Sequence, residues 1–136
     1  MAKTPPRYLL DTGVIIRHLR GQSRAVRLLR TLGKRERLAI ASITRLEVHV
    51  GMREHERYRT QKLLSRFITY GLDIEIADRA GDFIRKYRDR GVMISVPDAI
   101  IAATAIQYGL TLVTFNPKDF PMPGLSLFPA ASLEQG

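Results

Sequence analysis

Short apolar runs alternate with longer helical runs along almost the whole chain. The short runs have the length of buried strands and lie at residues 8–10, 38–41, 72–76, 110–114 and 125–128. The longer runs have the spacing or the end signals of helices and cover residues 12–20, 24–32, 42–50, 55–67, 80–90 and 97–108. Strands that alternate with helices indicate a mainly parallel sheet with helices on both faces. We therefore predict an α/β fold whose central sheet has four or five strands.

Several residues predict where individual elements begin, end and bury their side chains. Ser23 is a good N-cap for the second helix, and Gly33 is expected to end it. Residues 72–76 alternate apolar and polar side chains, which is typical of a strand with one wet face. The expected buried face of the helix at 55–67 consists of Tyr58, Leu63, Leu64 and Phe67.

Size and composition favour one soluble globular unit. The chain has 136 residues, of which 45% are hydrophobic, and it has no cysteine. Disulfides, thiolate metal sites and a cysteine nucleophile are therefore excluded. The start of the chain is too short and polar for a signal peptide, and the apolar stretch at 99–106 is too short to span a membrane. We predict one domain over residues 1–136, flexible tails at 1–6 and 130–136, and a cytoplasmic location.

The net charge of +9 is unevenly distributed. Residues 1–68 carry 16 Lys and Arg and 5 acidic residues, whereas residues 69–136 carry 6 and 8. A strongly basic half is typical of proteins that bind a polyanion such as nucleic acid. A solvated surface or an acidic protein partner explains the same charge, so composition leaves all three open.

Three acidic residues stand close to the junctions between elements, and each has an ordinary explanation. Asp11 can cap the helix that follows the first strand. Glu47 can form a capping box with Thr44, unless Ser42 is the cap. Asp98 lies in a first helical turn, where its charge complements the helix dipole.

Taken together, the three acids indicate a metal site. The carboxyl ends of parallel strands share one edge of the sheet, and ligands bind at that edge in open α/β folds. Asp98 precedes an almost wholly apolar helix, which is typical of a buried element that would hold it in a fixed position. Three carboxylates that meet raise one another's pKa unless a divalent cation neutralises them. Because the ligands are all oxygens, they favour Mg²⁺ or Mn²⁺ over Zn²⁺.

Four segments in order resemble the motifs of PIN domains, and in particular of the VapC-type toxins of toxin–antitoxin pairs. They read Tyr-Leu-Leu-Asp-Thr-Gly-Val-Ile-Ile at 8–16, Ser-Ile-Thr-Arg-Leu-Glu-Val at 42–48, Pro-Asp-Ala-Ile-Ile-Ala-Ala-Thr-Ala at 97–105 and Leu-Val-Thr-Phe-Asn-Pro-Lys-Asp-Phe at 112–120. Each motif is weak alone, but the ordered set spans most of the chain. The resemblance implies a PIN-like fold and a Mg²⁺- or Mn²⁺-dependent endoribonuclease that leaves a 5′-phosphate.

The resemblance also assigns roles to residues. Asp11, Glu47 and Asp98 match its acidic motif positions and would be the catalytic metal ligands. The family's frequent fourth acid is replaced here by Asn116, and Asp119 is a second candidate for completing the site. Thr12 and Thr114 match hydroxyl positions that support the acids.

Further expectations concern the substrate and the partners. Arg17, Arg20 and Arg45 are candidate phosphate contacts, whereas each of the three histidines is expected to be a bystander. The resemblance implies an RNA substrate, a cognate antitoxin and a homodimer. A housekeeping PIN nuclease and a non-catalytic RNA- or protein-binding module are the alternatives.

Overall fold

One parallel sheet organises the computed structural model, which describes residues 4–129. Within that range the strands are β1 (Tyr8–Leu10), β2 (Leu38–Ala41), β3 (Ile68–Tyr70), β4 (Thr111–Val113) and β5 (Ser126–Leu127). Their order is β3-β2-β1-β4-β5, and every neighbouring pair is parallel. The predicted α/β class with a mainly parallel sheet is confirmed.

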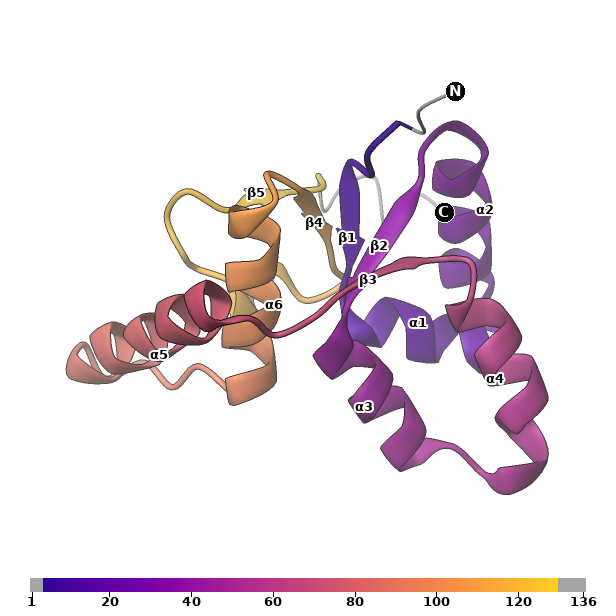
Figure 1. Ribbon diagram of the computed structural model, residues 1–136, viewed down its shortest axis with the longest axis horizontal. Coiled ribbons are helices and arrows are strands. Elements are labelled where there is room, and N and C mark those ends of the chain that lie inside the picture. The colour runs from indigo at the N-terminus through magenta and orange to yellow at the C-terminus, as the bar shows by residue number, and fades with distance from the viewer. Residues whose placement is uncertain (1–3, 130–136) are drawn as a thin grey trace.

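The helices divide into two groups. They are α1 (Thr12–Leu19), α2 (Ser23–Arg35), α3 (Ser42–Gly51), α4 (Arg57–Leu64), α5 (Ile74–Asp89) and α6 (Val96–Gln107), together with the short 3₁₀ turns η1 (Glu54–Glu56) and η2 (Pro117–Asp119). Figure 1 shows α1 to α4 on one side of the sheet and α5 with α6 on the other. This division follows from right-handed crossovers, because the chain moves outward from β1 to β3 and then returns past β1 to β4.

Each face of the sheet has its own apolar core, because successive strand residues point to opposite faces. Ala39 and Ala41 of β2 pack toward α5 and α6, and Leu38 and Ile40 pack toward α1, α2 and α4. All four are buried, which is the burial expected of an inner strand of a parallel sheet. The two layers fix the helices that carry the polar residues at the sheet edge.

The predicted strand at 72–76 is wrong. The third strand is Ile68–Tyr70, and Ile74 already belongs to α5. The side chain of Asp73 accepts a hydrogen bond of 2.8 Å from the backbone N–H of Ile76 and so caps the helix. Ile74 is 80% exposed whereas Ile76 is fully buried. The alternation that favoured a strand is therefore the first turn of an amphipathic helix.

Other predicted boundaries also needed correction. The second helix does not end at Gly33 but continues to Arg35, and its N-cap is Gln22 rather than Ser23. The charged helix follows the 3₁₀ turn η1 and spans only Arg57–Leu64, so the predicted span 55–67 was too long. Tyr58, expected in its buried face, is 78% exposed, while Leu63 and Leu64 are buried as predicted.

The remaining expectations concern the termini and membranes. Residues 1–3 and 130–136 of the predicted tails lie outside the described residues. Among residues 4–129, none of the helices combines the length and the apolar run that crossing a bilayer requires.

Candidate active site

Asp11 lies where the strand order reverses, at the carboxyl edge of the sheet. Leu10 pairs with Val113 in the register of β1 and β4, so Asp11 and Thr114 follow these strands side by side. The Thr114 hydroxyl donates a hydrogen bond of 2.7 Å to Asp11 Oδ2, and the Thr12 backbone N–H donates one of 2.8 Å to Oδ1. The crevice outside such a reversal is where open α/β sheets bind ligands.

Asp11 is also the N-cap of α1, as its position after the first strand indicated. It is 7% exposed, and this burial raises its pKa to about 6. The Thr114 hydroxyl and the Thr12 N–H lower the pKa, whereas the negative charges of Asp98 and Glu47 raise it. A buried carboxylate with acidic neighbours is stabilised by a nearby cation.

Glu47 has no role in capping. The N-cap of α3 is Ala41, without a side-chain cap, so the capping box from Thr44 to Glu47 is not formed. Instead, the Thr12 hydroxyl donates a hydrogen bond of 2.7 Å to Glu47 Oε1. Thr12 therefore contacts both Asp11, through its backbone, and Glu47, through its side chain.

Asp98 occupies the first turn of α6, as its position after Pro97 indicated. Its backbone N–H donates a 3.2 Å hydrogen bond to Oγ of Ser95, which caps the helix. Residues 99–105 of this helix are all buried, so its start is held firmly against the sheet. Partial burial raises the pKa of Asp98, a side-chain hydrogen bond from Ser95 lowers it, and the charges of Asp119 and Glu47 raise it.

The two candidates for completing the acid set lie in the loop after β4. Asp119 is an exposed residue in η2 whose charge acts on Asp98. Asn116 is also exposed, and its backbone N–H donates a 3.0 Å hydrogen bond to the Thr114 hydroxyl. Asn116 thus supports Thr114 through its backbone, so this contact does not depend on its side chain.

The acids are electrostatic neighbours, but they do not form a finished ligand set. Within residues 4–129, no three acidic or histidine side chains are grouped so that they could hold one ion directly. The donors are nevertheless all oxygens, and Asp11 is a buried carboxylate with two further acids acting on it. This chemistry fits a hard divalent cation, with water completing its coordination.

The predicted phosphate contacts occupy different places around the site. Arg17 is on α1, half-buried, with its guanidinium 4.6 Å from the centre of the Phe115 ring. Arg20 is the exposed C-cap of α1, where Gly21 ends the helix with a φ of 75°. Arg45 lies on α3, and its carbonyl oxygen is 2.7 Å from His49 Nδ1.

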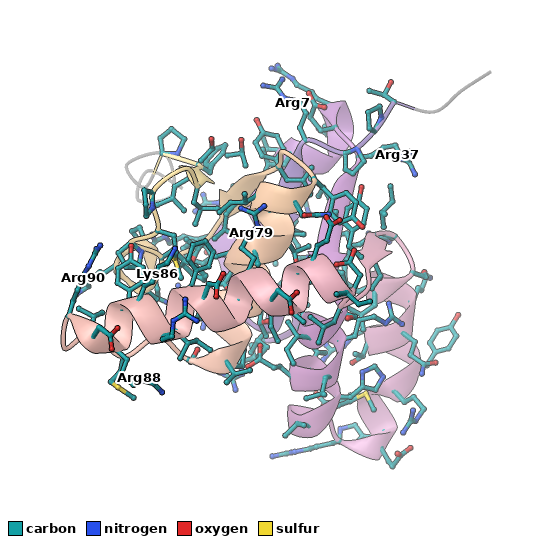
Figure 2. All side chains as sticks on the ribbon, turned by 60° about the vertical axis from the view of Figure 1, so that its left-hand side comes forward. Arg7, Arg37, Arg79, Lys86, Arg88 and Arg90 are labelled. Atoms are coloured by element: carbon teal, nitrogen blue, oxygen red, sulfur yellow. The ribbon has the colours of Figure 1, made fainter. Side chains whose placement is uncertain are left out.

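Basic residues also lie on the opposite side of the sheet from α1 and α3. Figure 2 shows Arg79, Lys86 and Arg88 projecting from α5 and Arg90 at its C-cap, although this helix belongs to the acidic half of the sequence. All four are exposed. Charge along the sequence therefore did not reveal which surface the cations would occupy.

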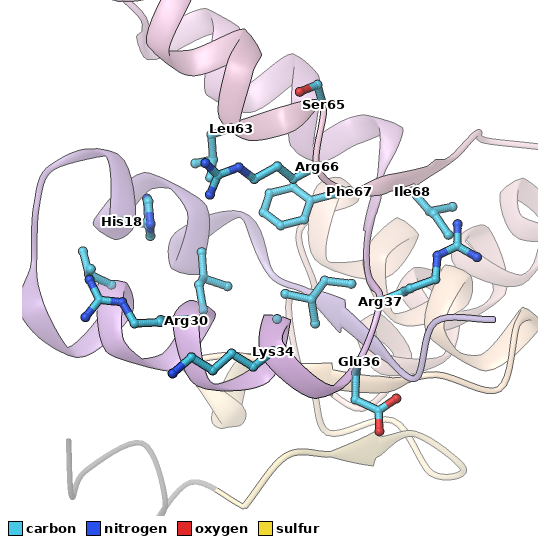
Figure 3. Close-up of a pocket in the computed structure, with 14 residues that line it drawn as sticks. His18, Arg30, Lys34, Glu36, Arg37, Leu63, Ser65, Arg66, Phe67 and Ile68 are labelled. Atoms are coloured by element: carbon cyan, nitrogen blue, oxygen red, sulfur yellow. The ribbon is translucent and has the colours of Figure 1, made fainter. Parts of the chain in front are cut away.

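A cavity of about 660 Å³ lies between α2, α4 and the start of β3, and none of the predicted site residues lines it. Arg30, Lys34, Arg37 and Arg66 border it, together with apolar side chains such as Phe67 (Figure 3). His18 also lines it, and burial, followed by the charges of Arg66 and Arg59, lowers the pKa of this histidine. The cavity therefore carries four basic side chains and one acid, Glu36, and it is separate from the acids of the proposed site.

Comparison with known proteins identifies the family. A sequence model of the PIN domain matches residues 8–121. The chain belongs to the PIN domain family. The chain is 40% identical over 114 residues to Ribonuclease VapC10 of Mycobacterium tuberculosis, which covers 84% of this chain and 86% of that protein.

Two solved structures of the same fold come from complexes. A chain of a toxin–antitoxin complex from Klebsiella pneumoniae is 35% identical, with a TM-score of 0.74 and coverage of 87% of this chain and 94% of that chain. A chain of VapBC2 from Rickettsia felis, bound to a DNA fragment from its promoter, is 26% identical, with a TM-score of 0.78 and coverage of 89% and 96%. The PIN-like fold expected from the four motifs is thus confirmed.

Two residues next to the acids were not predicted as parts of the site. Ser95 caps the helix that carries Asp98, and its spacing of three residues from an acid was a usable signal. Thr44 is fully buried, and its Oγ1 is 2.9 Å from Thr12 Oγ1. That contact joins α3 to α1, so no local sequence pattern reports it.

Proposed function

We propose that this chain is a divalent-metal-dependent endoribonuclease and the toxin of a toxin–antitoxin pair. The observation that carries the proposal is the buried Asp11 at the reversal of strand order, with Glu47 and Asp98 acting on it electrostatically. The similarity to Ribonuclease VapC10 supports RNA hydrolysis as the reaction.

Asp11, Glu47 and Asp98 would hold Mg²⁺ or Mn²⁺, in part through water molecules, and Asp119 would contribute through water. When bound, such an ion lowers the pKa of a coordinated water and offsets the charge that develops on the scissile phosphate. The chain itself orients the acids. Thr114 and the Thr12 backbone each donate to one oxygen of Asp11, and the Thr12 hydroxyl donates to Glu47 Oε1. Each Asp11 oxygen has a further lone pair for a cation, and Glu47 retains Oε2.

The arginines nearest to these elements would bind the RNA backbone. Arg17 and Arg20 are in or directly after α1, which begins beside Asp11, and Arg45 is two residues before Glu47. Contacts of this kind position a nucleic acid without reading its bases. The substrate would therefore be selected by shape or single-strand character.

The proposed partners follow from the similar structures. A chain from a toxin–antitoxin complex is 35% identical to this protein over 87% of its length, which supports a cognate antitoxin. We also propose a homodimer and a cytoplasmic location, in line with the VapC-type resemblance.

The decisive experiment measures RNA cleavage by the purified protein with Mg²⁺ or Mn²⁺ and with EDTA. The wild type should cleave only with the metal, and Asp98→Asn should abolish cleavage while circular dichroism shows an unchanged fold. Asp78→Asn is the matched control, because Asp78 is an exposed acid on α5 outside the proposed site. Its activity should equal that of the wild type.

Full activity of Asp98→Asn would refute the proposed role of this residue. Salt-sensitive RNA binding without metal-dependent cleavage by the wild type would instead favour a non-catalytic module. Cleavage in vitro without growth arrest on overexpression would favour a housekeeping nuclease over a toxin.

A further inference from the structure

Thr44 begins a chain of two hydrogen bonds that ends on Glu47. Its Oγ1 is 2.9 Å from Thr12 Oγ1, and the Thr12 hydroxyl donates to Glu47 Oε1 at 2.7 Å. A hydroxyl has a single proton to donate, and the proton of Thr12 is directed to the carboxylate. Thr44 must therefore be the donor to Thr12, and the order of donation is Thr44 to Thr12 to Glu47.

The three hydrogen-bonded residues connect two helices. Thr44 and Glu47 are three residues apart on α3, whereas Thr12 is the first residue of α1. The two hydrogen bonds thus run from α3 to α1 and from α1 back to α3. Because the Thr12 backbone also donates to Asp11 Oδ1 at 2.8 Å, the position of Thr12 affects two of the proposed ligands.

The ordinary alternative is that Thr44 only fills space in the core. A threonine inside a helix often donates to the carbonyl oxygen four residues earlier, as Thr104 does to Ile100 at 2.7 Å. Within residues 4–129, the hydroxyl of Thr44 has no hydrogen-bond partner besides Thr12. Thr44 is also fully buried, so water does not compete for this bond.

We propose that Thr44 is a positioning residue that orients Glu47 through Thr12. By donating to Thr12, it fixes the rotamer from which the Thr12 hydroxyl reaches Oε1 of Glu47. The inference rests on the proposed function, because it takes Glu47 as a ligand of the divalent cation. Glu47 would contact the ion directly, whereas Thr44 would act on Glu47 only through Thr12.

Removal of such supporting hydrogen bonds typically weakens metal binding by about 10- to 100-fold. Thr44→Val deletes the donor and keeps the branched shape, so we expect an affinity for Mn²⁺ about tenfold lower than in the wild type. Thr44→Ser retains the hydroxyl and should bind Mn²⁺ within about twofold of the wild type. Rescue by Ser separates the hydroxyl from the packing of the methyl group.

A double-mutant cycle tests whether Thr44 acts through Thr12. Isothermal titration calorimetry would measure the Kd for Mn²⁺ of EDTA-stripped wild type, Thr12→Val, Thr44→Val and the double variant. If the chain operates as inferred, Thr44→Val has no further effect once the Thr12 hydroxyl is absent. The double variant should then bind Mn²⁺ within about twofold of Thr12→Val.

Two outcomes would overturn the inference: an unchanged Kd in Thr44→Val, or multiplicative losses in the double variant. Thr44→Ala replaces Thr44→Val in the cycle if the latter does not fold. Binding of Mn²⁺ by a wild type that cleaves no RNA would end the proposed nuclease function, while the cycle would still decide the role of Thr44. A wild type that does not bind Mn²⁺ would overturn both.

Discussion

Replacement of Asp11 by Asn should make the metal-free protein more stable at pH 7.5. Burial raises the pKa of Asp11 from its ordinary value of 3.8 to about 6. Since one pKa unit corresponds to about 1.4 kcal/mol, keeping this carboxylate ionised in the folded state costs about 3 kcal/mol at neutral pH. Asn avoids that cost but weakens the hydrogen bonds from Thr114 and Thr12, which removes about 1 kcal/mol. The expected net gain is about 2 kcal/mol.

The gain should depend on pH in a defined direction. Because the pKa of Asp11 is higher in the folded than in the unfolded protein, the folded state binds more protons between pH 3.8 and about 6. Stability conferred by this group therefore falls as the pH rises through that window and stays low above it. At pH 4, most folded molecules already have a protonated Asp11, so the advantage of Asn should disappear.

Urea unfolding in EDTA at both pH values measures the effect. With an m-value of about 2 kcal/mol/M, the midpoint of Asp11→Asn should exceed that of the wild type by about 1 M at pH 7.5. Asp78→Asn controls for the loss of one negative charge, because Asp78 is exposed, and its midpoint should not move. A lower midpoint for Asp11→Asn at pH 7.5 would refute the reasoning that ionised Asp11 destabilises the metal-free fold.

Two further outcomes follow from the same contacts. A proton on Asp11 competes with a cation, so the Kd for Mn²⁺ measured by calorimetry should rise up to about tenfold per pH unit below about pH 6; a flat profile would exclude Asp11 as a ligand. Thr114→Val removes the hydroxyl that lowers the pKa of Asp11, so the acid limb of the cleavage profile should move up by about one pH unit, and an unmoved limb would contradict this role.

Local patterns predicted those elements whose sequence and burial agree. The apolar run after Pro97 became α6, with residues 99–105 all buried, and the run at 38–41 became the fully buried β2. The first strand was likewise predicted at its observed residues. In each case the side chains alone indicated both the type of element and its surroundings.

Local patterns failed where the tertiary structure overrode them. The third strand has only three residues, of which none is fully buried, so it left no apolar run to detect. Residues 72–76 alternated like a strand, but the Asp73 cap and the contacts of Ile76 with the core make this segment a helix. Gly33 did not end α2, because Leu29 and Leu32 pack on the core and hold the last turn in place.

The sequence by itself determined that acidic residues would follow strands of a parallel sheet, because strand and helix patterns depend on near neighbours in the chain. Only the tertiary structure decided which groups meet. It aligned β1 with β4, which brought Thr114 onto Asp11 across a separation of 103 residues. It also packed α1 against α3, which joined Thr44 to Thr12 and gave Glu47 a hydrogen bond in place of a cap. Such contacts depend on strand order and helix packing, and neither is encoded in the spacing of the residues that meet.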